Sequence, residues 1–182
     1  MSTTLPSRRE DILRNYLRAK DENRPHLLAG VFSADATLEV HNRASEIAFP
    51  AFTEGRAAIA DVLVRTFGQT YENVYSFYMA RPASDTQTFT CDWLVVMSEK
   101  NSKNVRVGCG RYDWTFAPDA AGLATNLVIS IEAMLVLPPE SLEPTYRWMA
   151  ELEYPWSSAM AVEAAMPSVA PLAQIVRYLS RR

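Results

Sequence analysis

The sequence has little of what marks a disulfide-rich, membrane-spanning or nucleic-acid-binding protein. Its 182 residues include only two cysteines, two histidines and six glycines, and 18 basic side chains stand against 21 acidic ones. Because it contains no run of about 18 apolar residues, we expect no membrane span. Because no long basic run is present, we expect no contact with nucleic acid. The N-terminal segment lacks the apolar core of a secretory signal, so a cytoplasmic protein is the expectation.

The cysteines and glycines also lack the spacing of cofactor and metal motifs. Cys91 and Cys109 do not form a C-x-x-C pair. A hairpin turning near residues 101–102 would place Cys109 opposite Leu94, so both cysteines are interpreted as small buried hydrophobes. The glycines around Cys109 do not complete a dinucleotide-binding fingerprint, and two isolated histidines do not make a zinc site. We therefore expect neither a cofactor nor a metal ion.

Apolar residues recur at helical spacing in three segments before residue 70. The first helix ends at the polar run after Lys20, a short second helix ends near Ser33, and a third is closed by Gly68. Between the second and third helices, alternating residues predict a strand from Ala36 to Asn42. Segments rich in Val, Ile, Thr and aromatic residues then predict an antiparallel meander, with strands at 71–80, 86–99, 105–117 and 123–137.

The composition changes near Leu137, because glycine is absent after it and proline becomes frequent. The tail has two segments at helical spacing, interrupted by Pro155 and Pro167. The sequence therefore predicts an α+β fold over residues 1–137, in which three helices cover one face of a curved antiparallel sheet. Residues 138–182 are predicted to form a helical extension, a lid or a dimer clasp, packed on the same domain or on a partner subunit.

Four short segments carry a resemblance to a known family: YLRAKD at 16–21, FSADATLE at 32–39, GRAAI at 55–59 and GRYDW at 110–114. With the order of the predicted elements, they resemble the nuclear-transport-factor-2-like (cystatin-like α+β cone) superfamily, in particular its SnoaL-like and ketosteroid-isomerase-like enzymes. The resemblance covers roughly residues 8 to 137. It implies an apolar pocket between the concave sheet face and the helices. The superfamily includes isomerases, dehydratases, cyclases, epoxide hydrolases and non-catalytic modules, so the fold alone does not fix a reaction.

Strand alternation predicts which side chains point into that pocket. In the strand at 86–99, Phe89, Trp93 and Met97 share the bulkier face and are predicted to contact the ligand, with a simple core stripe as the alternative. The resemblance places the hydroxyl of Tyr16 as a donor to a developing oxyanion, and Tyr112 as a second donor. The alternative for Tyr16 is a ring packed in the helix–sheet core.

The resemblance also places a proton-abstracting aspartate at the end of the first strand, where this sequence has Val40. His41 is the nearest candidate base, but it points to the opposite face unless a β-bulge turns it inward; otherwise it is a surface histidine. Asn42 shares the face of Val40, and both are predicted to contact the ligand, but an amide is not a base. We therefore expect no ketosteroid isomerase activity, and we expect Tyr16→Phe to alter binding rather than rate.

A second group of charged residues resembles the arginine and carboxylates of limonene-epoxide-hydrolase-like members, in which a water is activated. These residues are Arg111, Asp113 and Glu132. The alternation that points Tyr112 inward points Arg111 and Asp113 outward, so only one arrangement can hold. The alternative for these charges is an ion pair at the surface or at an interface.

The leading hypothesis is a SnoaL-like domain that binds a hydrophobic small molecule, with isomerisation, cyclisation or dehydration as its candidate reactions. The first alternative is a non-catalytic ligand-binding or dimerisation module, and the second is an epoxide-hydrolase-like hydrolase. We expect a homodimer, because family members commonly pair through the outer sheet face. In this chain that face would carry an apolar patch of Leu94, Val96, Val105 and Val107.

Overall fold

The computed structural model describes residues 8–181, which form one six-stranded sheet. In the chain, helices precede the first strand, separate the second strand from the third and follow the last strand. In chain order the elements are α1 (Arg8–Asp21), the 3₁₀ segment η1 (Pro25–Gly30), β1 (Phe32–Asn42), β2 (Phe52–Glu54), α2 (Arg56–Ala60), the π-helical segment η2 (Asp61–Thr66), α3 (Phe67–Thr70), β3 (Tyr71–Tyr78), β4 (Thr88–Glu99), β5 (Val105–Phe116), β6 (Ala124–Leu137), the 3₁₀ segment η3 (Pro139–Ser141), α4 (Leu142–Ala150), α5 (Ala159–Ala164) and α6 (Leu172–Leu179).

The strand order in the sheet is β2-β1-β6-β5-β4-β3. The predicted meander is confirmed, because β3, β4, β5 and β6 pair with their neighbours in antiparallel fashion. The prediction of a wholly antiparallel sheet is wrong at one pair, since β1 and β6 are parallel. A helical layer and four strands separate β1 from β6 in the chain, so the two strands are not bound by the hairpin geometry that makes neighbours antiparallel. The short strand β2, for which the sequence analysis predicts no strand, pairs with β1.

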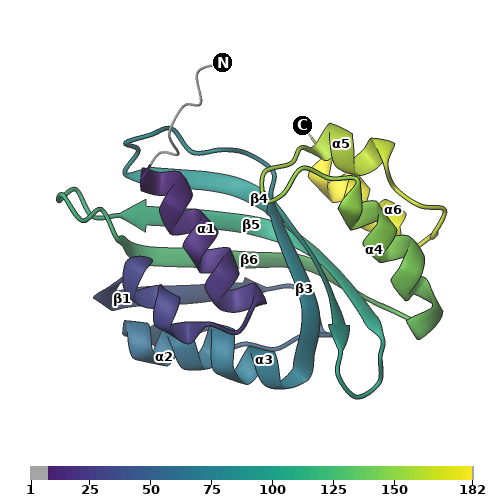
Figure 1. The fold of residues 1–182 in the computed structure, drawn as a ribbon, viewed down its shortest axis with the longest axis horizontal. Helices are drawn as coiled ribbons and strands as arrows, with labels where there is room; N and C mark the ends of the chain where they lie inside the picture. The colour runs from purple at the N-terminus through teal and green to yellow at the C-terminus, as the bar shows by residue number, and fades with distance from the viewer. Residues whose placement is uncertain (1–7, 182) are drawn as a thin grey trace.

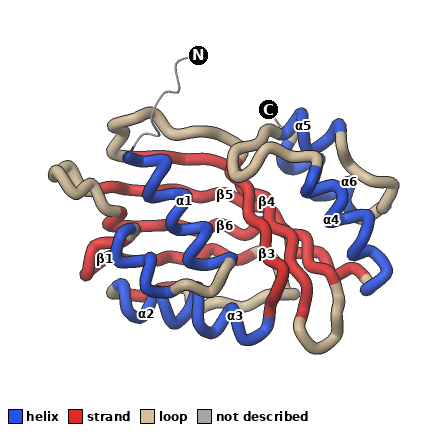
Figure 2. The backbone as a smooth tube through the Cα atoms, viewed as in Figure 1, coloured by secondary structure: helices blue, strands red, loops and turns tan. Residues whose placement is uncertain are grey.

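The sheet carries helices on both faces, and each face has its own apolar cluster. Trp93 and Tyr112 belong to the cluster under α1, α2 and α3, whereas Leu94 and Val107 belong to the cluster under α4, α5 and α6. Figures 1 and 2 show these two helical groups apart, with the strands between them. The α+β architecture of helices on a curved, mostly antiparallel sheet is thereby confirmed.

The extension covers the outer face of the sheet that belongs to the same chain. Leu94, Val96, Val105 and Val107 are each 0% exposed, and they share one apolar cluster with residues of α4 and α6 such as Trp148. The patch that gave the reason for a homodimer is therefore covered within one chain. The homodimer stays a prediction, but an exposed apolar patch on the outer sheet face no longer supports it. The extension also holds three α-helices rather than the predicted two, since α5 lies between Pro155 and Pro167.

Polar contacts attach the extension to the edge of the sheet. The amide of Tyr78 in the edge strand β3 donates to the carbonyl of Pro155 at 2.8 Å, and the amide of Ser157 donates to the carbonyl of Tyr78 at 2.8 Å. Near the end of the chain, Arg181 binds both carboxylate oxygens of Asp92 in β4 at 2.9 Å. The extension thus satisfies part of an edge that would otherwise be open to pairing with another chain.

Two predicted helix ends are wrong. The second helix ends at Gly30, and β1 begins at Phe32 although the alternation becomes visible only from Ala36. The third helical segment continues past Gly68 to Thr70. A Cβ at Gly68 would lie 3.0 Å from the Asn23 side chain, so this glycine serves close packing rather than termination.

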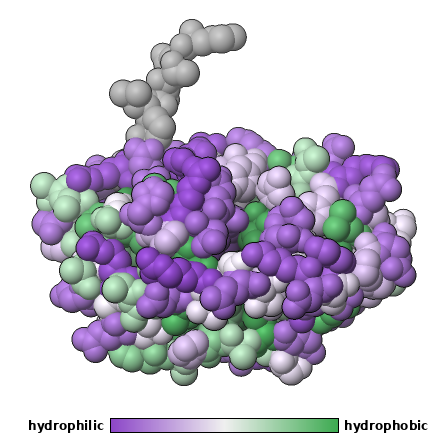
Figure 3. Space-filling view, turned by 60° about the horizontal axis from the view of Figure 1, so that its bottom comes forward, coloured by the Kyte–Doolittle hydropathy of each residue, from purple (hydrophilic) through white to green (hydrophobic). Residues whose placement is uncertain are grey.

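The face shown in Figure 3 is mostly hydrophilic, and hydrophobic residues appear on it in small separate areas. This distribution is usual for a protein surface and does not mark a large docking patch on that face. No helix of the described residues is long and apolar enough to cross a membrane.

Candidate functional site

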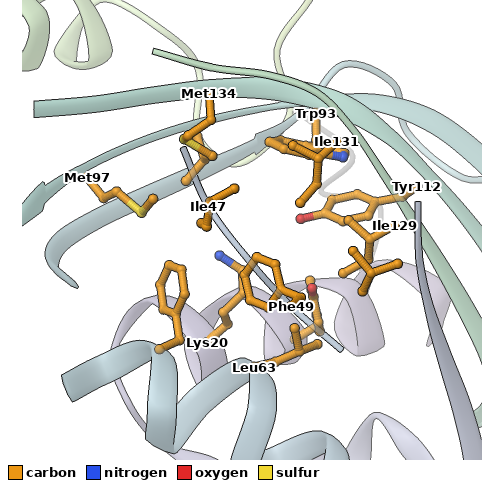
Figure 4. Close-up of a pocket in the computed structure, with 14 residues that line it drawn as sticks. Lys20, Ile47, Phe49, Leu63, Trp93, Met97, Tyr112, Ile129, Ile131 and Met134 are labelled. Atoms are coloured by element: carbon orange, nitrogen blue, oxygen red, sulfur yellow. The ribbon is translucent and has the colours of Figure 1, made fainter. Parts of the chain in front are cut away.

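A cavity lies between the concave sheet face and the helix layer (Figure 4). Its volume is about 50 Å³. Since roughly 10–15 Å³ on this measure holds one water, the cavity has room for a few waters or one compact organic molecule. Ten lining residues are aliphatic, phenylalanine or methionine, and four carry a polar group. The complete lining is Tyr16, Lys20, Val40, Ile47, Phe49, Leu63, Phe67, Trp93, Val95, Met97, Tyr112, Ile129, Ile131 and Met134.

Two glycines in β5 leave room for the side chains that form the wall of the cavity. Gly108 and Gly110 stand on the same face of β5 as Tyr112, which points inward. A Cβ at Gly108 would lie 2.4 Å from Cε of Met134, and one at Gly110 would lie 2.7 Å from the Trp93 ring. Met134 and Trp93 can therefore lie against β5 only because these positions have no side chain.

The alternation of β4 places its wall residues as predicted, with one exception. Trp93 and Met97 line the cavity together with Val95. Phe89 is buried but does not line the cavity, because it lies further along β4, opposite Trp114, where aromatic side chains fill the space. The prediction that Phe89 contacts a ligand is therefore corrected to a role in the core.

Two buried donors at the cavity make no well-formed hydrogen bond among the described residues: the hydroxyl of Tyr16, which has the Tyr112 hydroxyl as a neighbour without bonding geometry, and the indole N–H of Trp93. The Tyr16 ring packs edge-on against Tyr112 at 5.9 Å and against Trp114 at 4.9 Å between ring centroids. Burial raises the pKa of Tyr16, an increase that the Tyr112 hydroxyl partly opposes. Burial also raises the pKa of Tyr112. Both tyrosines are therefore neutral donors at physiological pH.

Lys20 is the site residue that sequence reasoning missed. Its Nζ lies 2.6 Å from a carboxylate oxygen of Asp21 and 2.8 Å from the Ser76 hydroxyl. The Ser76 amide donates to the other Asp21 oxygen at 2.8 Å. The Lys20 and Asp21 side chains are only 8% and 3% exposed. Figure 4 shows the Lys20 nitrogen on the inner side of the ring of lining residues. The available signal was its spacing of four residues from Tyr16, which puts both on one helix face.

The end of β1 does not supply a base. Val40 lines the cavity, as its alternation predicts. The pairing of β1 with β6 runs without a bulge from Thr37 to Asn42, so nothing turns His41 inward. The His41 side chain is 65% exposed and lies 3.7 Å from Glu39, so it is a surface histidine outside the cone cavity, and its catalytic role stays a prediction.

Asn42 positions a loop instead of lining the cavity. Its amide nitrogen donates to the carbonyl of Ile47 at 2.6 Å, and its amide oxygen accepts from the backbone of Ala44 at 2.9 Å. Ile47 and Phe49, which follow in the same loop, do line the cavity. The prediction that Asn42 contacts a ligand is therefore corrected, because both amide groups are used to hold this loop.

The epoxide-hydrolase-like arrangement is not formed at the cavity. Arg111 and Asp113 point away from it and pair with each other at 3.0 Å. Glu132 pairs with Arg43 at 3.1 Å, also on the outside. The predicted surface ion pairs are thus what the structure shows. The two cysteines, Cys91 and Cys109, are buried and free, and burial raises the pKa of both thiols. Within residues 8–181 no group of three His, Cys, Asp or Glu side chains is placed to hold a metal ion.

The comparisons with known proteins agree with the fold. A family model described as a SnoaL-like domain matches residues 8–126. No curated protein matches the chain. Among solved structures, a type 2 hexachlorocyclohexane dehydrochlorinase matches with a TM-score of 0.56 and 13% identity, over 70% of this chain and 84% of its own.

Two further structures show the same fold. A nuclear transport factor 2-like protein from Salmonella enterica serovar Typhimurium matches with a TM-score of 0.53 and 18% identity, over 68% of this chain and 87% of its own. A ketosteroid-isomerase-like protein from Catenulispora acidiphila, solved with trimethylamine, matches with a TM-score of 0.51 and 20% identity, over 65% of this chain and 83% of its own. The family match spans more than half of the chain, and the chain therefore belongs to the SnoaL-like domain family.

Proposed function

We propose that this chain binds a compact, largely apolar molecule that carries an oxygen acceptor, and that the cone cavity is its binding site. The observation that carries the proposal is the pair of buried donors without partners, Tyr16 and Trp93, in a cavity with an otherwise apolar wall. A buried donor without a partner costs about 1–3 kcal/mol, so a ligand oxygen that accepts from these groups recovers free energy on binding.

All four polar groups of the lining are able to donate. They are the hydroxyls of Tyr16 and Tyr112, the indole N–H of Trp93 and the ammonium of Lys20. The ammonium has three N–H bonds, and Asp21 and the Ser76 hydroxyl account for two of them. None of the lining residues is a carboxylate, an amide or a histidine. This set of donors favours a carbonyl or another acceptor oxygen on the ligand over an amine.

An enzyme that acts by proton transfer is the second candidate. It is favoured by Tyr16 and Tyr112, whose rings are in contact and whose hydroxyls resemble a pair of oxyanion donors. The name of one structural relative, a dehydrochlorinase, is that of an enzyme. Proton abstraction also needs a positioned base, which contributes about 10²- to 10⁴-fold. Because no carboxylate or histidine lines the cavity, binding is the function that the geometry supports better.

A ketone and a hydrocarbon of the same shape test the binding proposal. Cyclohexanone and methylenecyclohexane are titrated into ¹⁵N-labelled protein, and the indole signal of Trp93 is followed. We expect both probes to shift this signal and cyclohexanone to bind more tightly. Tyr16→Phe should weaken cyclohexanone binding about fivefold, the equivalent of one hydrogen bond, and leave methylenecyclohexane unchanged.

Tyr178→Phe is the matched control, since Tyr178 lies in α6 on the other side of the sheet. A Trp93 signal that neither probe shifts in a saturable way would contradict the binding proposal. The same samples in D₂O separate the two candidate functions. Exchange of the α-protons of cyclohexanone at the uncatalysed rate supports a binding protein, whereas accelerated exchange that Lys20→Met abolishes would establish the enzyme.

A further inference from the structure

A second cavity lies against the edge strand β3, separate from the cone cavity. Its volume is about 410 Å³, and it shares no lining residue with the cone cavity. Residues of β3, of α4 and of the segment after α4 surround it; Figure 1 shows α4 on the opposite side of β3 from α1. The lining consists of Tyr75, Phe77, Tyr146, Met149, Ala150, Leu152 and Tyr154.

The aromatic rings of this cavity meet at nearly right angles. Tyr75 lies 6.1 Å from Tyr146 at 76° and 6.2 Å from Tyr154 at 79°, and Phe77 lies 5.4 Å from Tyr154 at 90°. Rings at right angles form corners. A group that sits in such a corner contacts aromatic faces, which carry the negative part of the ring quadrupole.

Core packing does not account for all of these rings. Tyr75 and Tyr154 are 46% and 47% exposed. Tyr146 is fixed in place, because its hydroxyl donates to the carbonyl of Asn73 at 2.7 Å. Met149 and Leu152 are buried and give the cavity an apolar floor. The cavity is therefore a fixed aromatic corner open to solvent.

The acidic side chains near the rings are paired with basic ones. Asp21 pairs with Lys20, Glu22 with Arg24 and Glu72 with Lys103. None of the lining residues is itself charged. A cation in this cavity would therefore be held by the ring faces and not by an unpaired carboxylate.

We propose that Tyr75, Tyr146 and Tyr154 form an aromatic cage for a small molecule that carries a quaternary ammonium group. Such a group needs no hydrogen-bond acceptor, and the lining offers ring faces and methyl contacts rather than acceptors. Its methyl groups pack on Met149 and Leu152. The cage is independent of the ligand in the cone cavity, because the two cavities have no lining residue in common.

Choline and 3,3-dimethylbutan-1-ol test the cage, because they have nearly the same shape and differ in charge. Each is titrated into the full chain, and chemical shifts of the Tyr75 and Tyr154 rings are followed. We expect choline to bind about fivefold more tightly than the alcohol, as for a partly exposed cation–π contact. Tyr75→Leu and Tyr154→Leu should each remove this preference while the fold, followed by circular dichroism, is kept.

Tyr178→Leu is the matched control and should leave choline binding unchanged, since Tyr178 does not line the cage. Equal binding of choline and the alcohol would overturn the proposal, because shape alone would then explain it. Choline binding that survives both Tyr75→Leu and Tyr154→Leu would place the site elsewhere and would also overturn it. Binding of a trimethyllysine peptide without binding of choline would overturn the assignment to a small molecule.

Discussion

The two faces of one sheet are used in opposite ways in this protein. On the outer face, Leu94, Val96 and Val107 are fully buried against helices of the same chain. On the inner face, the same strands carry Gly108, Gly110 and the unpartnered indole of Trp93 around a cavity, which α1 closes with the Tyr16 hydroxyl. Adjacent residues of β4 and β5 therefore have different roles, because successive side chains of a strand point alternately to the packed outer face and to the cavity.

This difference shows where stability and binding reside. An outer face packed by aliphatic side chains stabilises the folded state and offers a ligand neither free space nor unpaired polar groups. An inner face with unpaired donors gives up part of that free energy and leaves groups that a ligand can satisfy. Changes on the outer face should therefore affect stability first, and changes on the inner face should affect binding first.

Truncating a core residue under the outer face should have the largest effect. Ile175 in α6 is 0% exposed. Ile175→Ala should lower the free energy of unfolding by about 2–5 kcal/mol, as measured by urea denaturation. Gln174→Ala, at an exposed neighbouring position, is the control and should change it by less than about 0.5 kcal/mol. Similar stabilities for the two variants would show that the extension does not stabilise the sheet.

Alkaline pH should lower the free energy of unfolding, because the inner face contains buried tyrosines. Burial raises the pKa of Tyr16, Tyr78 and Tyr112 above the ordinary value of 10.0. The unfolded chain then loses these protons first, so the stabilisation is complete below pH 10 and is lost as the pH rises toward the folded-state values. At pH 11 each tyrosine should cost about 1.4 kcal/mol.

Tyr112→Phe tests this assignment. The variant should lose about 1.4 kcal/mol of the extra decrease in urea stability between pH 9 and pH 11, which Tyr112 shares with the other buried tyrosines and with the two buried thiols. Tyr178→Phe should reduce the decrease less than Tyr112→Phe does, because the Tyr178 side chain is only partly buried. A stability that is independent of pH over this interval would show that the inner tyrosines are not buried in solution.

The two glycines under the cavity should separate stability from binding. A Cβ at Gly110 would lie 1.9 Å from the backbone oxygen of Ser130, which cannot move easily. Gly110→Ala should therefore cost about 1–3 kcal/mol of unfolding free energy. At Gly108 the Cβ would meet the flexible end of Met134 at 2.4 Å. Gly108→Ala should cost less than Gly110→Ala and should abolish cyclohexanone binding, because Met134 is displaced into the cavity. Unchanged binding in Gly108→Ala would contradict the placement of the site.

Much of the fold could be predicted from local patterns in the sequence. The pleat forces strict alternation, which is why Trp93, Met97 and Tyr112 lie on the face predicted for them. The parallel pairing of β1 with β6 could not be predicted, because it depends on how distant segments meet rather than on the pattern of either strand. The burial of the outer face by the extension likewise depends on tertiary packing and could not be predicted from local patterns.

The missed parts of the site have physical reasons of the same kind. Lys20 has the character of an exposed helix residue until the fold brings Ser76 in β3 against it and against its neighbour Asp21. Asn42 lies on the correct face by alternation, but at the strand end its amide has a backbone partner close by in Ile47. The importance of Gly110 depends on a ring that reaches it from another strand.

The most direct test of the account compares two buried tyrosines of the inner face. The Tyr78 hydroxyl donates to the carbonyl of Leu13 at 3.0 Å, whereas the Tyr16 hydroxyl has no partner among the described residues. Urea denaturation of Tyr78→Phe should show a loss of about 1 kcal/mol, and that of Tyr16→Phe should show no loss or a small gain. Only Tyr16→Phe should weaken cyclohexanone binding while keeping stability. A Tyr16→Phe variant that loses as much stability as Tyr78→Phe and binds cyclohexanone unchanged would contradict the claim that the inner face keeps its donors for a ligand.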